Sequence, residues 1–187
     1  MNLHRLSVKY FVAEPARIDL ERVAPVFHSW IQEKKLPGVL IDVADYRHVH
    51  QGPGVILIGH EADWGIDCLE GKPGLLHTQK RWASGDLALR LESLFRNAIA
   101  AMKLLEGEPA LQGAFRFQAG RAEVSLLDRL QAPNEAKSFD ALRDAVASAA
   151  AKVYGGRTAA VARVEGDPRS PLRLHVEIPG APALGAL

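Results

Sequence analysis

The residues best suited to chemistry gather in one segment of the chain, between positions 42 and 77. Four of the seven histidines of the sequence lie there: His48, His50, His60 and His77. Several carboxylates lie among them. Histidine changes charge near neutral pH and is the side chain that metals use most often. The segment therefore indicates either a metal site or a pair of groups for general acid–base chemistry.

The spacing of two histidines is compatible with a metal site. His48 and His50 are two residues apart, so in an extended chain their imidazoles would point to the same side. A divalent ion held by histidines and a carboxylate, with open positions for water, is chemically reasonable here. We therefore take Asp45, His48, His50 and His60 as the candidate metal ligands. No other cofactor is indicated, so the cofactor stays unknown.

A metal-free site built on Asp42 is an equal alternative. Asp42 interrupts an otherwise apolar run, residues 39–43, and a buried carboxylate must be paired or hydrogen-bonded. If the chain closes as a hairpin through Gly52-Pro53-Gly54, Asp42 could face the His60 end of the returning strand. We take Asp42, His60 and Glu61 as the candidate catalytic residues of such an acid–base site.

Structural roles compete with both interpretations. A His-x-His sequence in a polar loop is often plain surface, and Asp42 could face water on an edge strand. The His-Glu-x-x-His zinc pattern is absent, because Ala62, Asp63 and Trp64 follow His60-Glu61. Nearby, Lys80-Arg81-Trp82 could clamp a phosphate or stack on a base, but three residues make a poor nucleic-acid site.

Composition limits the class of protein. The 187 residues are 48% hydrophobic and 24% charged, as in an ordinary globular protein. The net charge of +1 argues against a general nucleic-acid binder or a polybasic membrane anchor. A lone cysteine, Cys68, allows no intramolecular disulfide and favours a reducing compartment. With no signal-peptide pattern and no long apolar run, we predict a cytoplasmic protein without nucleic-acid or membrane partners.

The elements that would position these residues follow from periodicity and turn signals. Alternation or short apolar runs predict strands over 3–12, 39–44, 55–58, 64–69, 74–78, 114–118, 122–127, 159–164 and 172–178. The strands 39–44 and 55–58 should form a hairpin with a long polar loop, and Ala119-Gly120 should turn between 114–118 and 122–127. Apolar stripes predict helices from Pro25 to Lys35, from a cap at Asp86, and from a cap at Ser138.

This order of elements predicts an α+β fold. The sheet should be mainly antiparallel and built from hairpins, with about three helices packed on one face. Residues 1–178 should form a single domain, followed by a tail over 179–187. Glycine-rich phosphate loops between a strand and a helix are absent, so nothing supports nucleotide binding of that kind.

Three functional hypotheses remain open. The first is a homo-oligomeric protein, possibly an enzyme, that binds a small ligand or a metal in a His/Asp/Glu-rich pocket of the 42–61 hairpin. The second is a non-enzymatic assembly protein that pairs with further copies through exposed strand edges, because such edges must be covered. The third is an accessory factor of a larger complex. The expected partners are other copies of the chain and a small-molecule ligand.

Overall fold

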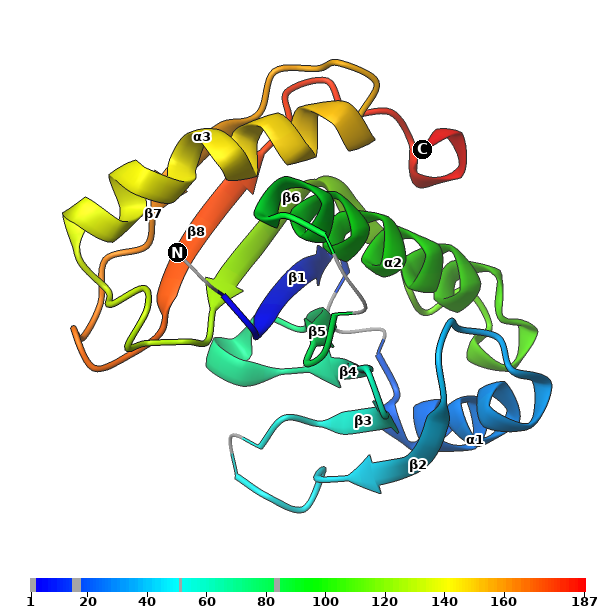
Figure 1. Cartoon of the computed structure of the whole chain (residues 1–187). Coiled ribbons are helices and arrows are strands. Elements are labelled where there is room, and N and C mark those ends of the chain that lie inside the picture. Colours follow the sequence, from blue (N-terminus) through cyan, green and yellow to red (C-terminus); the bar gives the residue numbers. More distant parts are fainter. Residues whose placement is uncertain (1–2, 15–17, 51, 83–84) are drawn as a thin grey trace.

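An antiparallel sheet forms the centre of the molecule (Figure 1). The computed structural model describes residues 3–14, 18–50, 52–82 and 85–187, and in these residues the sheet has eight strands in the order β2-β3-β4-β5-β1-β6-β8-β7. The strands are β1 (Leu6–Val12), β2 (Leu40–Asp45), β3 (Val55–Gly59), β4 (Ala62–Asp67), β5 (Gly74–Gln79), β6 (Phe117–Leu126), β7 (Ala160–Arg163) and β8 (Leu172–Glu177). Each neighbouring pair is antiparallel, which confirms the predicted class.

Three helices in the described part of the chain cover one face of this sheet. They are α1 (Val23–Glu33), which contacts β2 and β3, α2 (Leu87–Gly107), which contacts β5 and β1, and α3 (Ala136–Val153), which contacts β7 and β8. Alternate strand residues such as Val8, Val124 and Leu174 are fully buried beneath the helices. The intervening residues form a second, more polar face that carries no helix in the described residues (Figure 1).

The helix starts agree with the sequence in two cases and differ in one. Pro25 lies in the first turn of α1, where its missing N–H costs no intrahelical bond. The Asp86 carboxylate caps α2 by accepting from the Leu89 N–H at 3.0 Å, as predicted. The expected cap at Ser138 is wrong. The helix begins at Ala136 with Glu135 as its cap, three residues earlier than predicted, and the Phe139 N–H donates to the Glu135 carbonyl.

One predicted turn does not exist. The chain runs through Ala119 and Gly120 as a single ten-residue strand, β6, instead of two short strands. Gly120 lets the segment 178–181 pack closely against β6. The Ile178 N–H donates to the Gly120 carbonyl at 2.8 Å, and a Cβ at position 120 would lie 2.8 Å from the Ala181 Cβ. Sequence reasoning mistook a packing glycine for a turn glycine.

The 40–59 hairpin forms as predicted. β2 and β3 pair with Val43 opposite Leu57, and the Tyr46 N–H donates to the Gly54 carbonyl at 2.7 Å where the loop closes. Gly54 has a φ of +72°, a left-handed conformation that favours glycine. The hairpin lies at the edge of the sheet, so the outer side of β2 pairs with no strand in the described residues.

The last residues lie against the helical layer. The short 3-10 helix η5 (Leu184–Ala186) contacts α2, and Leu184 is buried there. The Lys103 ammonium donates to the Leu187 carbonyl. Across the described residues, no helix has the length and apolar character needed to cross a bilayer.

Candidate functional site

Asp42 lies on the exposed edge strand β2. The β2–β3 register sets Asp42 opposite Ile58, whereas His60 lies beside Val39 and donates its backbone N–H to the Val39 carbonyl at 2.8 Å. The Asp42 side chain is exposed and accepts from the N–H of its own neighbour, Val43. The structure therefore does not set Asp42 opposite His60.

The candidate metal ligands are spread over the hairpin. Asp45 forms a bidentate pair with Arg47, with Nε–Oδ1 and Nη2–Oδ2 distances of 2.9 and 2.6 Å, and this bonding lowers the pKa of Asp45 to about 2. His48 and His50 are exposed in the loop. Among the described residues, no group of three or more His, Cys, Asp or Glu could hold a metal ion. Metal binding by these residues stays a prediction.

The His60–Glu61 corner is the part of the predicted site that reaches a cavity. His60 Nε2 lies 2.7 Å from Arg81 Nη1, and the Glu61 carboxylate accepts from the Val39 N–H at 3.1 Å. This backbone hydrogen bond is the main cause of a lowered pKa at Glu61. Glu61 is thus an anion that holds the 36–39 turn beside the end of β4.

A cleft of about 400 Å³ opens next to this corner, between the ends of β4 and β5 and the first turns of α2; we call it the Trp64 cleft. Its lining is mixed, with two indoles, three charged groups and three neutral polar groups: Trp64, Trp82, Glu61, Arg81, Arg90, Gln79, Ser93 and Asn97. The aromatic and charged residues come from segments far apart in sequence. Sheet pairing and the placement of α2 bring them together.

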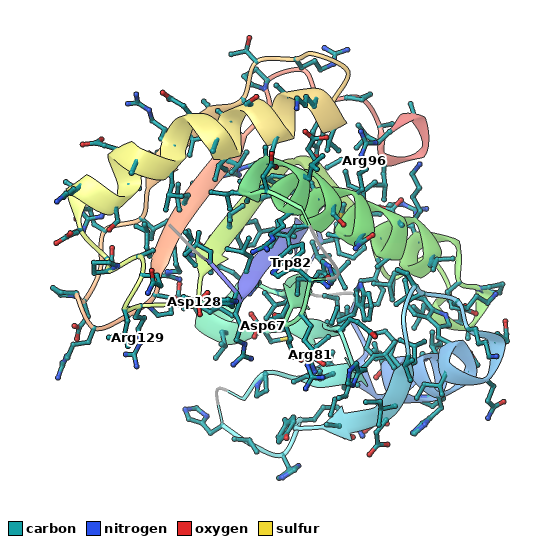
Figure 2. All side chains as sticks on the ribbon, in the orientation of Figure 1. Asp67, Arg81, Trp82, Arg96, Asp128 and Arg129 are labelled. Atoms are coloured by element: carbon teal, nitrogen blue, oxygen red, sulfur yellow. The ribbon has the colours of Figure 1, made fainter. Side chains whose placement is uncertain are left out.

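Two backbone carbonyls just before β1 accept hydrogen bonds from side chains that line the cleft. The Trp82 Nε1–H donates to the His4 carbonyl at 2.9 Å, and Arg90 Nη1 donates to the Leu3 carbonyl at 2.9 Å. The Arg90 guanidinium carbon lies 5.6 Å from the centroid of the Trp82 ring, within cation–π distance. Arg81 and Trp82 follow β5 after one intervening residue, Lys80, and Figure 2 shows both below α2.

Two lining residues of the Trp64 cleft carry buried nitrogens without a partner. These are Trp64 Nε1 and Arg90 Nε, which make no hydrogen bond to any described residue. Trp64 is 1% exposed. Buried polar atoms are nearly always paired, because an unpaired one loses its water without compensation. Both donors lie behind the surface of the cleft wall, where almost none of their own surface is accessible.

His77 supplies a third unpaired nitrogen behind Trp64. The two rings stack with centroids 5.0 Å apart, and His77 is fully buried. Burial lowers the pKa of His77 to about 4, so the ring is neutral at pH 7. His77 Nδ1 lies 3.3 Å from the Asp63 carbonyl, which can only accept, so Nδ1 carries the proton. Nε2, unpaired among the described residues, is then an acceptor.

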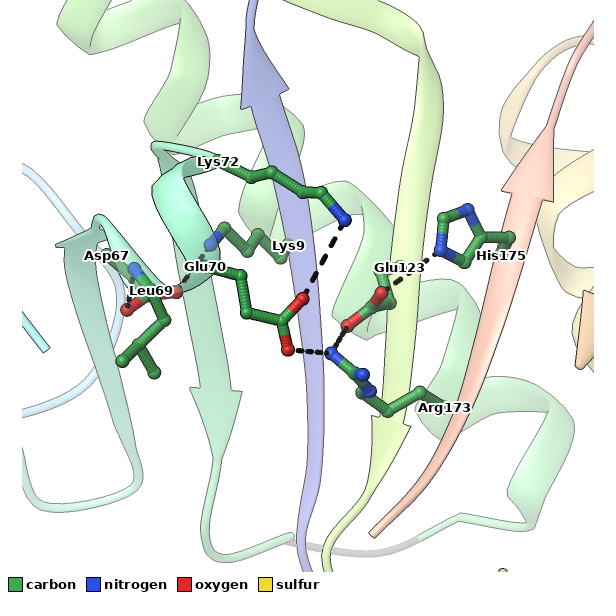
Figure 3. A network of polar contacts seen from close by, with 8 residues as sticks. All are labelled: Lys9, Asp67, Leu69, Glu70, Lys72, Glu123, Arg173 and His175. Carbon is green, nitrogen blue, oxygen red and sulfur yellow. Dashed lines mark hydrogen bonds and ion pairs between the residues drawn. The ribbon is translucent and has the colours of Figure 1, made fainter. Parts of the chain in front are cut away.

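A second polar cluster lies on the face of the sheet opposite the helices (Figure 3). Lys9 pairs with Asp67 at 2.5 Å, and Arg173 bridges Glu70 at 2.9 Å and Glu123 at 3.4 Å. A small cavity of about 200 Å³ adjoins these groups. Each lysine and arginine drawn in Figure 3 contacts a carboxylate of the same cluster.

Sequence reasoning found part of the Trp64 cleft and missed the rest. His60 and Glu61 were found through the density of ionisable residues, whereas Lys80-Arg81-Trp82 was considered as a phosphate clamp and set aside. Trp64 and Arg90 gave weaker signals: a tryptophan inside a strand, and an arginine bordering the apolar stripe of α2. Comparisons of the chain with family models, with curated proteins and with solved structures found no match.

Proposed function

We propose that this protein binds a small organic ligand in the Trp64 cleft. The observation that carries the proposal is the indole N–H of Trp64, which is buried in the cleft wall without a partner among the described residues. The volume of about 400 Å³ suits such a role, since ligand pockets typically span roughly 300–1,000 Å³. This shifts the predicted pocket from the loop of the 42–61 hairpin to its His60–Glu61 corner.

In the unliganded protein the Trp64 N–H is a buried donor without a partner among the described residues. Leaving a buried donor unpaired costs about 1–3 kcal/mol. A ligand acceptor that hydrogen-bonds to the Trp64 N–H would recover this cost. Because this nitrogen has almost no accessible surface, neighbouring side chains must move for the ligand to reach it. The amides of Gln79 and Asn97 and the hydroxyl of Ser93 add polar groups that can orient a ligand.

Ligand screening with matched tryptophan variants tests the proposal. Thermal unfolding is measured against a library of small metabolites for the wild type, Trp64→Phe and Trp30→Phe. Trp30 is the control, because it is equally buried but its Nε1–H donates to Glu108 at 3.4 Å. We expect at least one ligand to raise the Tm of the wild type and of Trp30→Phe, and to raise that of Trp64→Phe much less. An equal response of all three proteins would contradict the proposal.

The metal-binding form of the hypothesis has its own test. Metal content of the untagged protein is measured for the wild type, His48→Ala and His60→Ala. Stoichiometric metal that both variants lose would support a site at His48 and His60. Metal-free wild-type protein with unchanged stability in both variants would exclude that form and leave the Trp64 cleft as the binding site.

Self-association through β2 is a second candidate function. Ile41 on this edge strand is 56% exposed, and Val39, just before the strand, is 61% exposed. The outer backbone groups of β2 have no strand partner in the described residues. Two β2 strands from two copies could pair about a two-fold axis and cover both edges. We place such an oligomer in the cytoplasm, in keeping with the lone cysteine. Light scattering at micromolar concentration should show a dimer that Ile41→Lys dissociates, and a monomeric wild type would refute this candidate.

A further inference from the structure

We propose that a second site, on the open face of the sheet, binds an organic phosphate monoester between Lys72 and Arg121. The open face is the one that carries no helix in the described residues. This site shares no lining residue with the Trp64 cleft, so the inference goes beyond the proposed function. It follows from a cavity whose described lining is not acidic, from two accessible cations and from an apolar floor.

A cavity of about 300 Å³ lies on the open face beside the carboxyl end of β1; we call it the Lys72 cavity. None of its described lining residues is acidic. The lining includes two cations, a histidine, an amide and two apolar groups: Lys72, Arg121, His175, Gln118, Phe11 and Pro73. The volume is at the lower end of the range of roughly 300–1,000 Å³ that ligand pockets span. A cleft lined by one sign of charge raises the local concentration of ions of the opposite sign.

The two cations approach the cavity from opposite sides of β1. This strand pairs with β5 on one side, where Phe11 lies opposite Gly74, and with β6 on the other. Lys72 lies just before β5, whereas Arg121 lies within β6. Figure 3 shows Lys72 on the β5 side of β1 with its side chain directed toward β6. Since neighbouring strands are about 4.8 Å apart, β5 and β6 are about 10 Å apart, and both long side chains can reach an anion above β1.

Both cations are accessible to a ligand. The side chains of Lys72 and Arg121 are each 61% exposed. Their ion pairs are long, with 3.7 Å between Lys72 Nζ and a Glu70 oxygen and 4.0 Å between Arg121 Nε and a Glu177 oxygen. Exposed ion pairs contribute little, because water screens them. A ligand oxygen at hydrogen-bond distance can therefore compete for either cation.

The other lysine and arginine of this face are held more tightly by the protein. Lys9 Nζ lies 2.5 Å from an Asp67 oxygen, and Arg173 Nη1 lies 2.9 Å from a Glu70 oxygen. Their side chains are only 10% and 29% exposed. These short pairs occupy the cations beside the smaller cavity of about 200 Å³. We therefore assign the anion to the Lys72 cavity rather than to its neighbour.

A phosphate monoester suits the two cations better than a carboxylate. Near pH 7 it carries a charge of about −1.5 to −2, which balances the positive charges of Lys72 and Arg121. It also presents three strong acceptor oxygens that point in different directions. The two oxygens of a carboxylate lie in one plane and on one side of the carbon. Only the tetrahedral group can contact two cations that approach from opposite sides.

The floor of the Lys72 cavity is apolar and accepts the organic part of the ester. Phe11 is half-buried there, and Pro73 lines the same cavity. The Lys9 ammonium lies 5.8 Å from the centroid of the Phe11 ring, within cation–π distance, which helps to hold the ring in place. An apolar group attached to the phosphate gains by covering this surface.

Three probes test this class by calorimetric titration at pH 8, where a phosphate monoester is a dianion because its second pKa is about 6. Phenyl phosphate carries the dianion and an apolar ring. Phenyl sulfate has the same shape with one charge fewer, and inorganic phosphate lacks the ring. We expect phenyl phosphate to bind at least about tenfold more tightly than phenyl sulfate, the scale of one charge-assisted hydrogen bond. It should also bind more tightly than inorganic phosphate, which cannot cover Phe11.

Four variants locate the bound phosphate. Lys72→Gln and Arg121→Gln should each lower the affinity for phenyl phosphate about tenfold, because each removes one cation. The matched controls are Arg81→Gln, at the Trp64 cleft, and Arg96→Gln, on the exposed surface of α2 (Figure 2). Both controls should bind phenyl phosphate as the wild type does, and circular dichroism checks that all four variants fold.

Several results would overturn the inference. These are equal affinity for phenyl phosphate and either comparison anion, unchanged affinity in Lys72→Gln or in Arg121→Gln, and no binding of phenyl phosphate at all. A loss of affinity in Arg81→Gln would show that the phosphate binds in the Trp64 cleft, which refutes the Lys72 cavity and supports the first site. The tryptophan variants of the ligand screen do not touch the Lys72 cavity, so the two proposals can fail separately.

Discussion

Trp64 and His77 face each other across β4 and β5, with stacked rings 5.0 Å apart and one buried nitrogen on each ring unpaired among the described residues. The indole offers a donor. The imidazole, held neutral by burial and with its proton on Nδ1, offers an acceptor. A donor and an acceptor of this kind lie together in a fully buried layer beneath α2, next to the Trp64 cleft.

Replacing Trp64 by Phe should cost less stability than replacing Trp30 by Phe. Both indoles are buried, so the loss of ring volume is similar. Trp30→Phe also breaks the hydrogen bond to Glu108. Trp64→Phe instead removes a buried donor whose lack of a partner already destabilises the folded protein. We expect the difference in unfolding free energy to be about 1–3 kcal/mol, measured by urea denaturation at pH 7 without ligand. Equal losses would mean that the Trp64 N–H is satisfied in the free protein.

Lowering the pH should destabilise the protein through His77. Its folded-state pKa of about 4 lies below the ordinary value of 6.5, so the unfolded chain binds the proton first. The contribution of His77 to the free energy of unfolding is therefore fully present above pH 6.5. It declines as the pH falls from 6.5 to 4 and stays constant below pH 4. Linkage gives a loss of about 2 kcal/mol between pH 7 and pH 5.

The variant His77→Phe isolates this contribution. Phenylalanine keeps a flat ring against Trp64 and does not titrate. Urea denaturation of both proteins at pH 7 and pH 5 should show a smaller pH dependence in the variant. If the wild type and the variant lose the same free energy, His77 is not the group responsible.

Gly54→Ala should destabilise the protein much more than Gly71→Ala. Both glycines have a positive φ, +72° and +66°. A left-handed alanine therefore lowers the free energy of unfolding of each variant by about 1–2 kcal/mol. A Cβ at Gly54 would also lie 2.1 Å from the Ile66 carbonyl oxygen, whereas at Gly71 it would meet nothing within 4 Å. Thermal denaturation of the two variants compares them directly. A Tm for Gly54→Ala as high as that of Gly71→Ala would show that β3 and β4 can separate at this point without cost.

Local sequence signals predicted the strands and hairpins well, because each is fixed by neighbouring residues. The alternation in β1 and the pairing of the predicted strands 39–44 and 55–58 are examples. Gly120 misled the prediction because its role depends on Ala181, a contact that no local pattern records. Contacts between distant residues at the site are likewise not recorded in any local sequence pattern.

The cleft itself depends on contacts between distant segments. Ionisable density identified His60 and Glu61, but Trp64 and Arg90 share a wall only because β4 pairs with β5 beneath α2. That a nitrogen lacks a partner is a property of the assembled fold. Residue type and spacing alone do not reveal it.

The buried pair of Lys9 and Asp67 should show strong coupling. The side chains are 10% and 5% exposed and their charged atoms lie 2.5 Å apart on the open face of the sheet (Figure 3). Removing one partner leaves the other charge buried alone, which typically costs about 3–5 kcal/mol. We expect Lys9→Met and Asp67→Asn each to lose stability on this scale, while the double variant loses clearly less than the sum of the two.

Lys35 and Glu33 provide the matched cycle, with the same charge types 2.9 Å apart but both side chains well exposed. Solvent screens such a pair, so its coupling should be close to zero. Urea denaturation of both sets of variants gives the two coupling energies. If the Lys9–Asp67 coupling is as small as that of the exposed pair, water reaches these charges in solution. The open face would then be a hydrated surface rather than a closed ionic layer, and the cavity of about 200 Å³ beside Lys9 would be open to solvent as well.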